Sequence, residues 1–173
     1  MHWVEQDQKS TQGKILSTTR KKIFKKLTSK ILITMNKLLF QRFPDIGLLI
    51  LRIGVGSMLF LNHGFDKIIG GPEKWAGVGQ TGMGSLGIDI FPAFFGFMAA
   101  FSESVGSILI LLGLFFQPAA FFLFCTMAVG VLFHITSGIG SPELAMAYGL
   151  IYLTLFFAGP GKFSLDNKFF STD

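Results

Sequence analysis

An arginine lies inside one of the most apolar stretches of this chain, Leu48–Lys67, which reads LLILRIGVGSMLFLNHGFDK. A run this apolar is typical of a helix in lipid, where an arginine at the helix centre costs roughly 2.5 to 3.5 kcal/mol. A neighbouring helix must therefore shield Arg52, and a partner of opposite charge should exist elsewhere in the chain. Glu103, in the next apolar stretch, is the candidate. The pattern predicts a protein that crosses the bilayer several times and has a buried polar centre.

The composition agrees with insertion into a membrane. Half of the 173 residues are hydrophobic and only 14% are charged, whereas soluble domains contain about 25% charged residues. The length suits one helical bundle without a separate soluble domain. Cys125 is the single cysteine of the chain, so an internal disulfide and CxxC dithiol chemistry are excluded. Any redox role requires a bound cofactor or another subunit.

Positive charge is concentrated near the amino end, where ten of the 15 Lys and Arg residues lie between Lys9 and Arg42 with no acidic residue among them. Basic residues before a first membrane helix orient that end towards the cytoplasm, and we prefer this interpretation to nucleic-acid binding. We expect residues 1–42 to form a basic extension, partly an amphipathic helix on an anionic leaflet. For residues 1–20 a disordered tail is an equal alternative, and the acid-poor composition also resembles a transit peptide. The apolar residues that recur at helical spacing are Leu16, Ile23, Leu27, Ile31, Met35 and Leu38.

Four apolar segments follow, and they predict an all-α membrane protein built as a four-transmembrane-helix bundle. Each segment is near the ~20 residues that cross ~30 Å of hydrocarbon, although the last is somewhat short. A tight turn before Pro118 makes the second and third segments antiparallel neighbours. Four crossings that start in the cytoplasm return the carboxyl end to the cytoplasm. The expected helices are residues 46–63, 91–114, 118–135 and 144–158.

Two further stretches connect or end these helices. The glycine-rich stretch from Gly64 to Asp89 lacks the spacing of a phosphate loop, and we expect a flexible or re-entrant extracytoplasmic loop there. Residues 159–161 (Gly-Pro-Gly) should end the last helix. Beyond them, Ser164 and Asp166 either fold back to hydrogen-bond cytoplasmic helix ends or simply follow a helix terminator.

The polar residues of the apolar segments predict two sites. A rise of ~1.5 Å per residue puts Arg52 and Glu103 within about one helical turn of each other in depth, so we predict an ion pair between them. That pair either fixes the helix register or forms a proton or redox site, because ionisable groups inside membranes are often functional. Histidine and glutamate also suit metals, but their spacing matches no local metal motif, so we predict histidines that only hydrogen-bond and no metal. The outer-face cluster consists of His63, Lys67, His134 and Glu143.

Three segments of the chain resemble the DoxX family of small four-helix membrane proteins. They are LLILRIGVGSMLFLNHGFDKI at 48–68, FSESVGSILILLGLFFQPAAFFL at 101–123 and LTLFFAGPGKFSLD at 153–166. The arginine in the first segment, the HGxxK at its end, the ExxG in the second and the closing GPGKFSLD carry the resemblance together. It covers residues 46–166 and leaves the long amino extension outside. Gln117 also departs from the family pattern, in which a basic residue is common at this turn.

The resemblance implies a multi-pass protein of the bacterial inner membrane that is a subunit or accessory of an oxidoreductase system linked to thiols, sulfur or quinone. Relatives of this type include the DoxD-type subunit of a thiosulfate:quinone oxidoreductase. The resemblance implies quinone as a cofactor and an oxidoreductase subunit as a partner. The other expected partners are the lipid bilayer, which the composition indicates, and a second copy of the chain. No catalytic residue is transferred, and the chain is at most a subunit of an enzyme. The alternative is a membrane scaffold or adaptor whose buried charges serve only helix packing. A small-solute transporter fits less well, since four helices leave little room for a gated path.

Overall fold

The computed structural model describes the backbone of residues 2–170 and the side chains of residues 18–38 and 43–170. The side chain of Leu16, part of the predicted amphipathic face, lies outside the described residues. The chain forms two units, Met1–Phe43 and Pro44–Asp173, and each is described by itself. The long helix α1 (His2–Leu59) contributes residues to both units.

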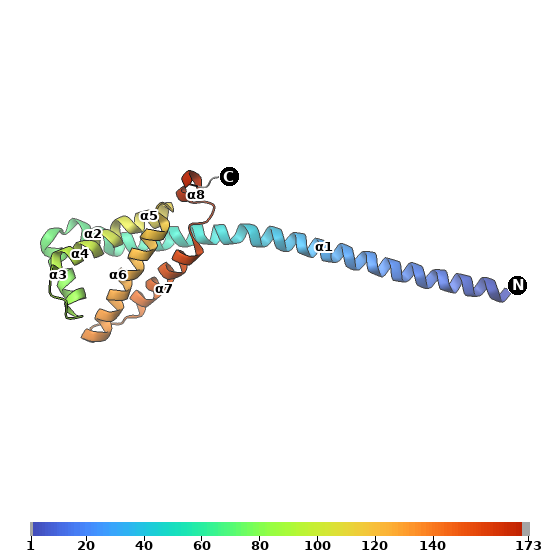
Figure 1. Cartoon of the computed structure of the whole chain (residues 1–173), viewed down its shortest axis with the longest axis horizontal. Coiled ribbons are helices and arrows are strands. Elements are labelled where there is room, and N and C mark those ends of the chain that lie inside the picture. The colour runs from blue at the N-terminus through green and yellow to red at the C-terminus, as the bar shows by residue number, and fades with distance from the viewer. Residues whose placement is uncertain (1, 171–173) are drawn as a thin grey trace. The chain divides into compact units, whose positions relative to one another are not determined.

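The second unit continues from α1 through a series of helices (Figure 1). Two short stretches of this series are π-helical. Every regular element of the described residues is a helix, which confirms the predicted all-α class. In chain order, the elements after α1 are η1 (Phe60–Gly64, π-helical), α2 (Phe65–Ile69), α3 (Gly71–Gly84), α4 (Pro92–Phe101), η2 (Ser102–Gly106, π-helical), α5 (Ser107–Leu112), α6 (Phe116–Ser137), α7 (Glu143–Ala158) and α8 (Leu165–Phe170).

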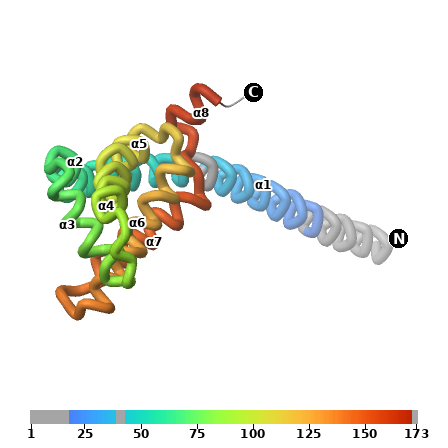
Figure 2. Tube along the Cα trace, turned by 60° about the vertical axis from the view of Figure 1, so that its left-hand side comes forward, coloured from blue at the N-terminus to red at the C-terminus, as the bar shows by residue number. Residues whose placement is uncertain are grey.

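Among the described residues, three helical stretches are long and apolar enough to cross a membrane: Thr18–Ile69, Pro92–Leu112 and Phe116–Ser137. This length and composition confirm the predicted membrane character. α7 is equally apolar but has only 16 residues. Helices α6 and α7 lie side by side (Figures 1 and 2). The fourth crossing stays a prediction.

The glycine-rich stretch predicted to be a loop is mostly helical, so that prediction was wrong. It forms α2 and α3, and α3 packs along α4 (Figures 1 and 2). Pro72 stands in the first turn of α3, where its missing N–H is not needed, and Glu73 adds the negative charge that a helix amino end favours. The glycines that indicated flexibility instead allow close packing between helices.

Gly79 of α3 and Gly96 of α4 bring the two helix backbones into direct contact. A Cβ atom on Gly79 would overlap the carbonyl group of Pro92, and one on Gly96 would overlap that of Trp75. Glycine at a helix crossing permits an approach that any side chain would prevent. The Trp75 ring packs edge-on against Phe97 beside this crossing, with 4.9 Å between ring centroids.

We expect Gly96→Ala to force α3 away from α4 and to lower the free energy of unfolding by about 1 to 3 kcal/mol, the usual penalty of overpacking. Gly77→Ala in α3 is the matched control, because no atom lies within 4 Å of the Cβ that it would add. The control should unfold no earlier than the parent, since alanine favours helix. Thermal unfolding of both variants in one detergent measures the difference. Equal unfolding temperatures would contradict the close crossing.

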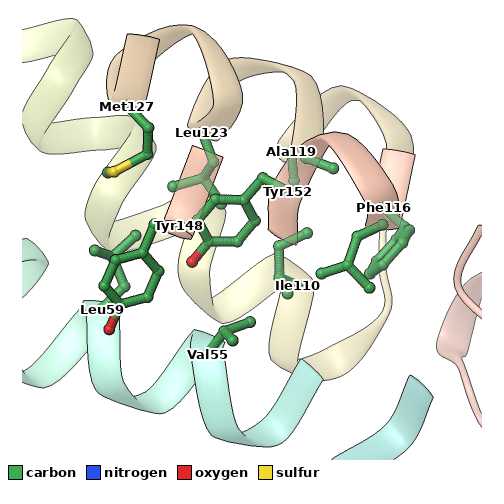
Figure 3. Close-up of a cluster of buried hydrophobic side chains, with 11 residues drawn as sticks. Val55, Leu59, Ile110, Phe116, Ala119, Leu123, Met127, Tyr148 and Tyr152 are labelled. Carbon is green, nitrogen blue, oxygen red and sulfur yellow. The ribbon is translucent and has the colours of Figure 1, made fainter. Parts of the chain in front are cut away.

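The hydrophobic core of the second unit lies between α1, α5, α6 and α7 (Figure 3). Tyr148 and Tyr152 point from α7 towards Val55 and Leu59 of α1. The two tyrosine rings stack with centroids 6.2 Å apart. Ile110 of α5 is fully buried in the same cluster, so these helices share one packed interior.

Candidate functional site

Glycines fix how the first apolar helix lies against the second. A Cβ atom on Gly56 would come within 2.8 Å of a backbone oxygen of α5, and one on Gly64 would overlap the backbone of Glu103. At the other end, a Cβ atom on Gly113 would lie 2.7 Å from Nη1 of Arg52. The two helices therefore run antiparallel, with Arg52 beside Gly113 and Gly64 beside Glu103.

This register separates the two buried charges that we expected to pair. Gly64, which lies against Glu103, is twelve residues beyond Arg52, a rise of about 18 Å along a helix. The predicted ion pair between Arg52 and Glu103 is therefore wrong, although both side chains are buried. The predicted depths were counted from the ends of the apolar segments, with the first helix ending at residue 63. The depths were wrong because the helical stretch continues past that residue.

Arg52 instead binds the carboxyl-terminal tail, the residues 159–170 that follow α7. Its Nη1 donates a hydrogen bond to the carbonyl of Pro160, and its Nη2 donates to that of Phe163 at 2.9 Å. The arginine is 1% exposed, and its guanidinium lies 6.0 Å from the centroid of the Phe116 ring, a cation–π arrangement. We call Arg52, its two carbonyl partners and the nearby Asp166 the Arg52 cluster.

Asp166 joins the tail to the start of α6. Its Oδ1 and Oδ2 accept hydrogen bonds from the backbone N–H groups of Phe115 and Phe116, each at 2.9 Å. Its own N–H donates to the carbonyl of Gly113 at 2.9 Å. A carboxylate at a helix amino end satisfies N–H groups that have no partner within the helix. Of the two alternatives left open for the tail, the structure shows the one in which Asp166 folds back onto a helix end, whereas Ser164 bonds within the tail.

The second buried charge, Glu103, pairs with Lys67. The Lys67 Nζ lies 2.5 Å from Oε2 of Glu103, and the glutamate side chain is only 6% exposed. Trp75 Nε1 donates a hydrogen bond to the Lys67 carbonyl at 2.9 Å and so ties α2 to α3. Lys67, which we predicted in the outer-face cluster, is thus the partner of Glu103, which we predicted in the buried polar centre.

Two π-helical turns meet at this ion pair. η2 contains Glu103, η1 comes shortly before Lys67, and the two turns contact each other. A π-helical turn adds one residue to an α-helix and is frequent at functional sites. Because each helical residue turns by about 100°, the extra residue in η1 re-aims the side chains that follow it, including Lys67.

A cavity of about 870 Å³ lies beside the ion pair, between α3, α4 and α6, and both Lys67 and Glu103 line it. Ser102 also lines the cavity; it is 4% exposed, and its Oγ has no hydrogen-bond partner among the described residues. Leaving a buried hydroxyl without a partner is unfavourable. The Oγ has almost no exposed surface of its own, so a rotation of the Ser102 side chain towards the cavity would be needed to give it a ligand as partner. The apolar lining includes Val78, Phe94, Phe95, Met98, Phe122, Val129 and Phe133.

Comparison with known proteins identifies the family. The DoxX family model matches residues 47–135. An uncharacterized protein of Haemophilus influenzae is 37% identical over 138 residues, which cover 75% of this chain and 96% of that protein. The chain belongs to the DoxX family. No solved structure matches it. The matched residues of this DoxX protein include Arg52, Lys67, Ser102 and Glu103, whereas the tail that Arg52 holds lies beyond the family model.

The other residues of the predicted outer-face cluster have separate surroundings in this DoxX protein. His63 lies half-buried in η1, and Glu143 begins α7 in an exposed position. The Nδ1 of His134 lies 2.6 Å from the backbone carbonyl of Ile139, a hydrogen bond between the last turn of α6 and the connection that follows it. Across the part of the chain that the structure describes, no three His, Cys, Asp or Glu side chains are grouped so that they could hold a metal ion.

Proposed function

We propose that this DoxX protein is a membrane-embedded, quinone-binding subunit of an oxidoreductase. The observation that carries the proposal is the cavity beside the Lys67–Glu103 pair. Its volume of about 870 Å³ falls within the ~300–1,000 Å³ of small-molecule sites, which are mostly apolar with a few convergent polar groups. A quinone, a polar ring on a long apolar chain, matches a cavity of this character.

Several residues around the cavity have different roles in binding such a ring. A bound quinone takes up two electrons and two protons to become the quinol. The Lys67 ammonium can donate a hydrogen bond and a proton to a ring oxygen, and the Ser102 hydroxyl supplies a second donor. Glu103 holds the ammonium in place and balances its charge where the surroundings are apolar. Phe94 and Phe95 offer apolar surface to the ring and its chain.

The electrons must come from a partner protein. Cys125 lines the cavity, but it is the single cysteine of the chain, so it cannot form a disulfide within the chain. A donor subunit with a reduced flavin or a dithiol supplies two electrons, and a dithiol also releases two protons as it becomes a disulfide. In this proposal the chain is a subunit of the enzyme and not the whole of it.

The proposed setting is a bacterial inner membrane, crossed four times with both termini in the cytoplasm. The 16 residues of α7 rise about 24 Å, and a bilayer can thin locally around such a short helix. Ten basic residues precede the first crossing, and Lys162 and Lys168 follow the last, as expected for cytoplasmic ends. With this orientation, the cavity lies in the extracytoplasmic half of the membrane.

Isolation from native membranes tests this proposal. The protein is purified in mild detergent, its bound lipids and quinones are extracted, and the accompanying proteins are identified by mass spectrometry. We expect about one quinone per chain and a dehydrogenase or sulfur-handling protein in the complex. Recovery of the chain alone, with phospholipid and no quinone, would contradict it.

We expect Ser102→Ala to weaken quinone binding about 3- to 10-fold, the equivalent of one hydrogen bond. The unfolding temperature should not fall, because the Ser102 hydroxyl has no partner among the described residues. Ser104→Ala is the matched control, since its Oγ donates to the carbonyl of Ala100 at 2.6 Å within the same helical stretch. Quinone titration followed by Trp75 fluorescence gives the affinities. If both variants bind quinone equally well, Ser102 does not contact the ring.

The Arg52 cluster supports a second candidate, a membrane scaffold without redox chemistry. The two terminal nitrogens of Arg52 are bonded to backbone carbonyls of the tail, which is a structural use of a buried charge. A quinone-free protein that still assembles with its partners when Lys67 and Ser102 are replaced would favour this candidate.

A further inference from the structure

We propose that residues 18–38 of α1 form a helix that binds the surface of an anionic membrane. This inference concerns the first unit only and does not depend on the quinone proposal. The segment is helical, and its side chains are exposed. It contains seven cationic residues and no acidic one, which are Arg20, Lys21, Lys22, Lys25, Lys26, Lys30 and Lys37.

The six lysines of this segment and its largest group of apolar side chains lie on different faces. With about 100° of rotation per residue, five large apolar residues fall within an arc of about 80°. All five are more than half exposed: Phe24 (73%), Leu27 (55%), Ile31 (57%), Met35 (54%) and Leu38 (63%). The six lysines lie on the remaining surface of the helix, whereas Arg20, near the amino end of the segment, falls within the arc. A lysine-rich face opposite an apolar stripe is the pattern of helices that lie in the headgroup region of a bilayer.

The apolar stripe decides between the partners that a basic helix can have. Attraction to nucleic acid explains the lysines but leaves five large apolar side chains in water. An anionic leaflet accounts for both faces, since phosphate headgroups attract the lysines and the acyl boundary accepts the stripe. Three further exposed apolar residues, Ile23, Leu32 and Ile33, lie outside the stripe, and Leu32 and Ile33 lie between lysines in the helical projection. The helix becomes more apolar as the chain nears the membrane-spanning stretch that follows Pro44.

Labels on the two faces of the full-length protein test the proposal. In a Cys125→Ala background, a fluorophore is attached to either Ile31→Cys on the apolar stripe or Ser29→Cys on the lysine face. Ser29 is exposed, and its hydroxyl bonds only to a carbonyl of its own helix, that of Lys26 at 3.0 Å. Each variant is reconstituted in vesicles of phosphatidylcholine with or without phosphatidylglycerol. Quenchers carried by lipid or dissolved in water then report the depth of each label.

With phosphatidylglycerol present, we expect lipid-borne quencher to act several-fold more strongly on the Ile31 label than on the Ser29 label. Without the anionic lipid, or after Lys21, Lys22, Lys25 and Lys26 are replaced by Gln, both labels should be open to the aqueous quencher. Equal exposure of the two labels in anionic vesicles would overturn the proposal. So would an asymmetry that persists without anionic lipid, or one that forms only when nucleic acid is added.

Discussion

Arg52→Met should destabilise the protein by about 3 kcal/mol or more, the loss of two charge-assisted hydrogen bonds. The substitution fills most of the space but leaves the carbonyls of Pro160 and Phe163 without their donor. It also removes the positive charge beside Asp166, which caps α6. Arg52→Lys should lie between the parent and Arg52→Met, because a single ammonium cannot reproduce the two-pronged guanidinium. Thermal unfolding in detergent, with limited proteolysis of the tail, measures both effects.

Lys162→Met provides the matched control for that comparison. Lys162 Nζ lies 3.8 Å from Oδ2 of Asp45, and its side chain is 70% exposed, so this pair should contribute little to stability. We expect its unfolding temperature to match that of the parent. If Arg52→Met unfolds at the same temperature as Lys162→Met, Arg52 does not anchor the tail.

Glu103→Ala should have the second large effect, a loss of about 3 to 5 kcal/mol, because it leaves the Lys67 ammonium without its counter-ion in a largely buried site. Replacing both residues by methionine should recover much of this loss, since an apolar pair is often as stable as a buried ion pair. Quinone affinity should fall at least tenfold in the single and the double variant alike. Unfolding curves and quinone titrations on the same three preparations separate stability from binding.

The double variant separates a role of the ion pair in quinone binding from a role in folding. A folded double variant that binds no quinone shows that the ion pair serves the ligand. A double variant that unfolds as early as Glu103→Ala would show that the charges are needed for the fold itself. Quinone affinity unchanged in a folded double variant would contradict the proposed role of Lys67.

Hydrophobicity was sufficient to predict where several helices lie. The segments expected at 118–135 and 144–158 correspond to α6 (Phe116–Ser137) and α7 (Glu143–Ala158). The burial of Arg52 and Glu103 also followed from the cost of exposing a charge to lipid. These features depend on which residues are apolar, and a sequence states that directly.

The pairing of the charges could not be predicted, because it depends on the register between helices. That register is set by close backbone contacts at Gly56 and Gly64, and the direction of Lys67 depends on the π-helical turn before it. One signal was available and missed: Pro72 followed by Glu73 is typical of a helix start. Ser102 and Trp75 stood out by neither charge nor spacing, and only the folded chain brings them to the Lys67–Glu103 site.

Photolabelling with a quinone that carries a photoreactive group tests the central claim most directly. The quinone is added to the purified protein, illuminated, and the modified peptides are identified by mass spectrometry. We predict that labelling concentrates on the cavity walls, in residues 77–83 of α3, 94–99 of α4 and 122–133 of α6, and that it is lost when Lys67 and Glu103 are both replaced by methionine. Labelling spread evenly over the apolar helices, and unchanged in that double variant, would contradict the quinone site.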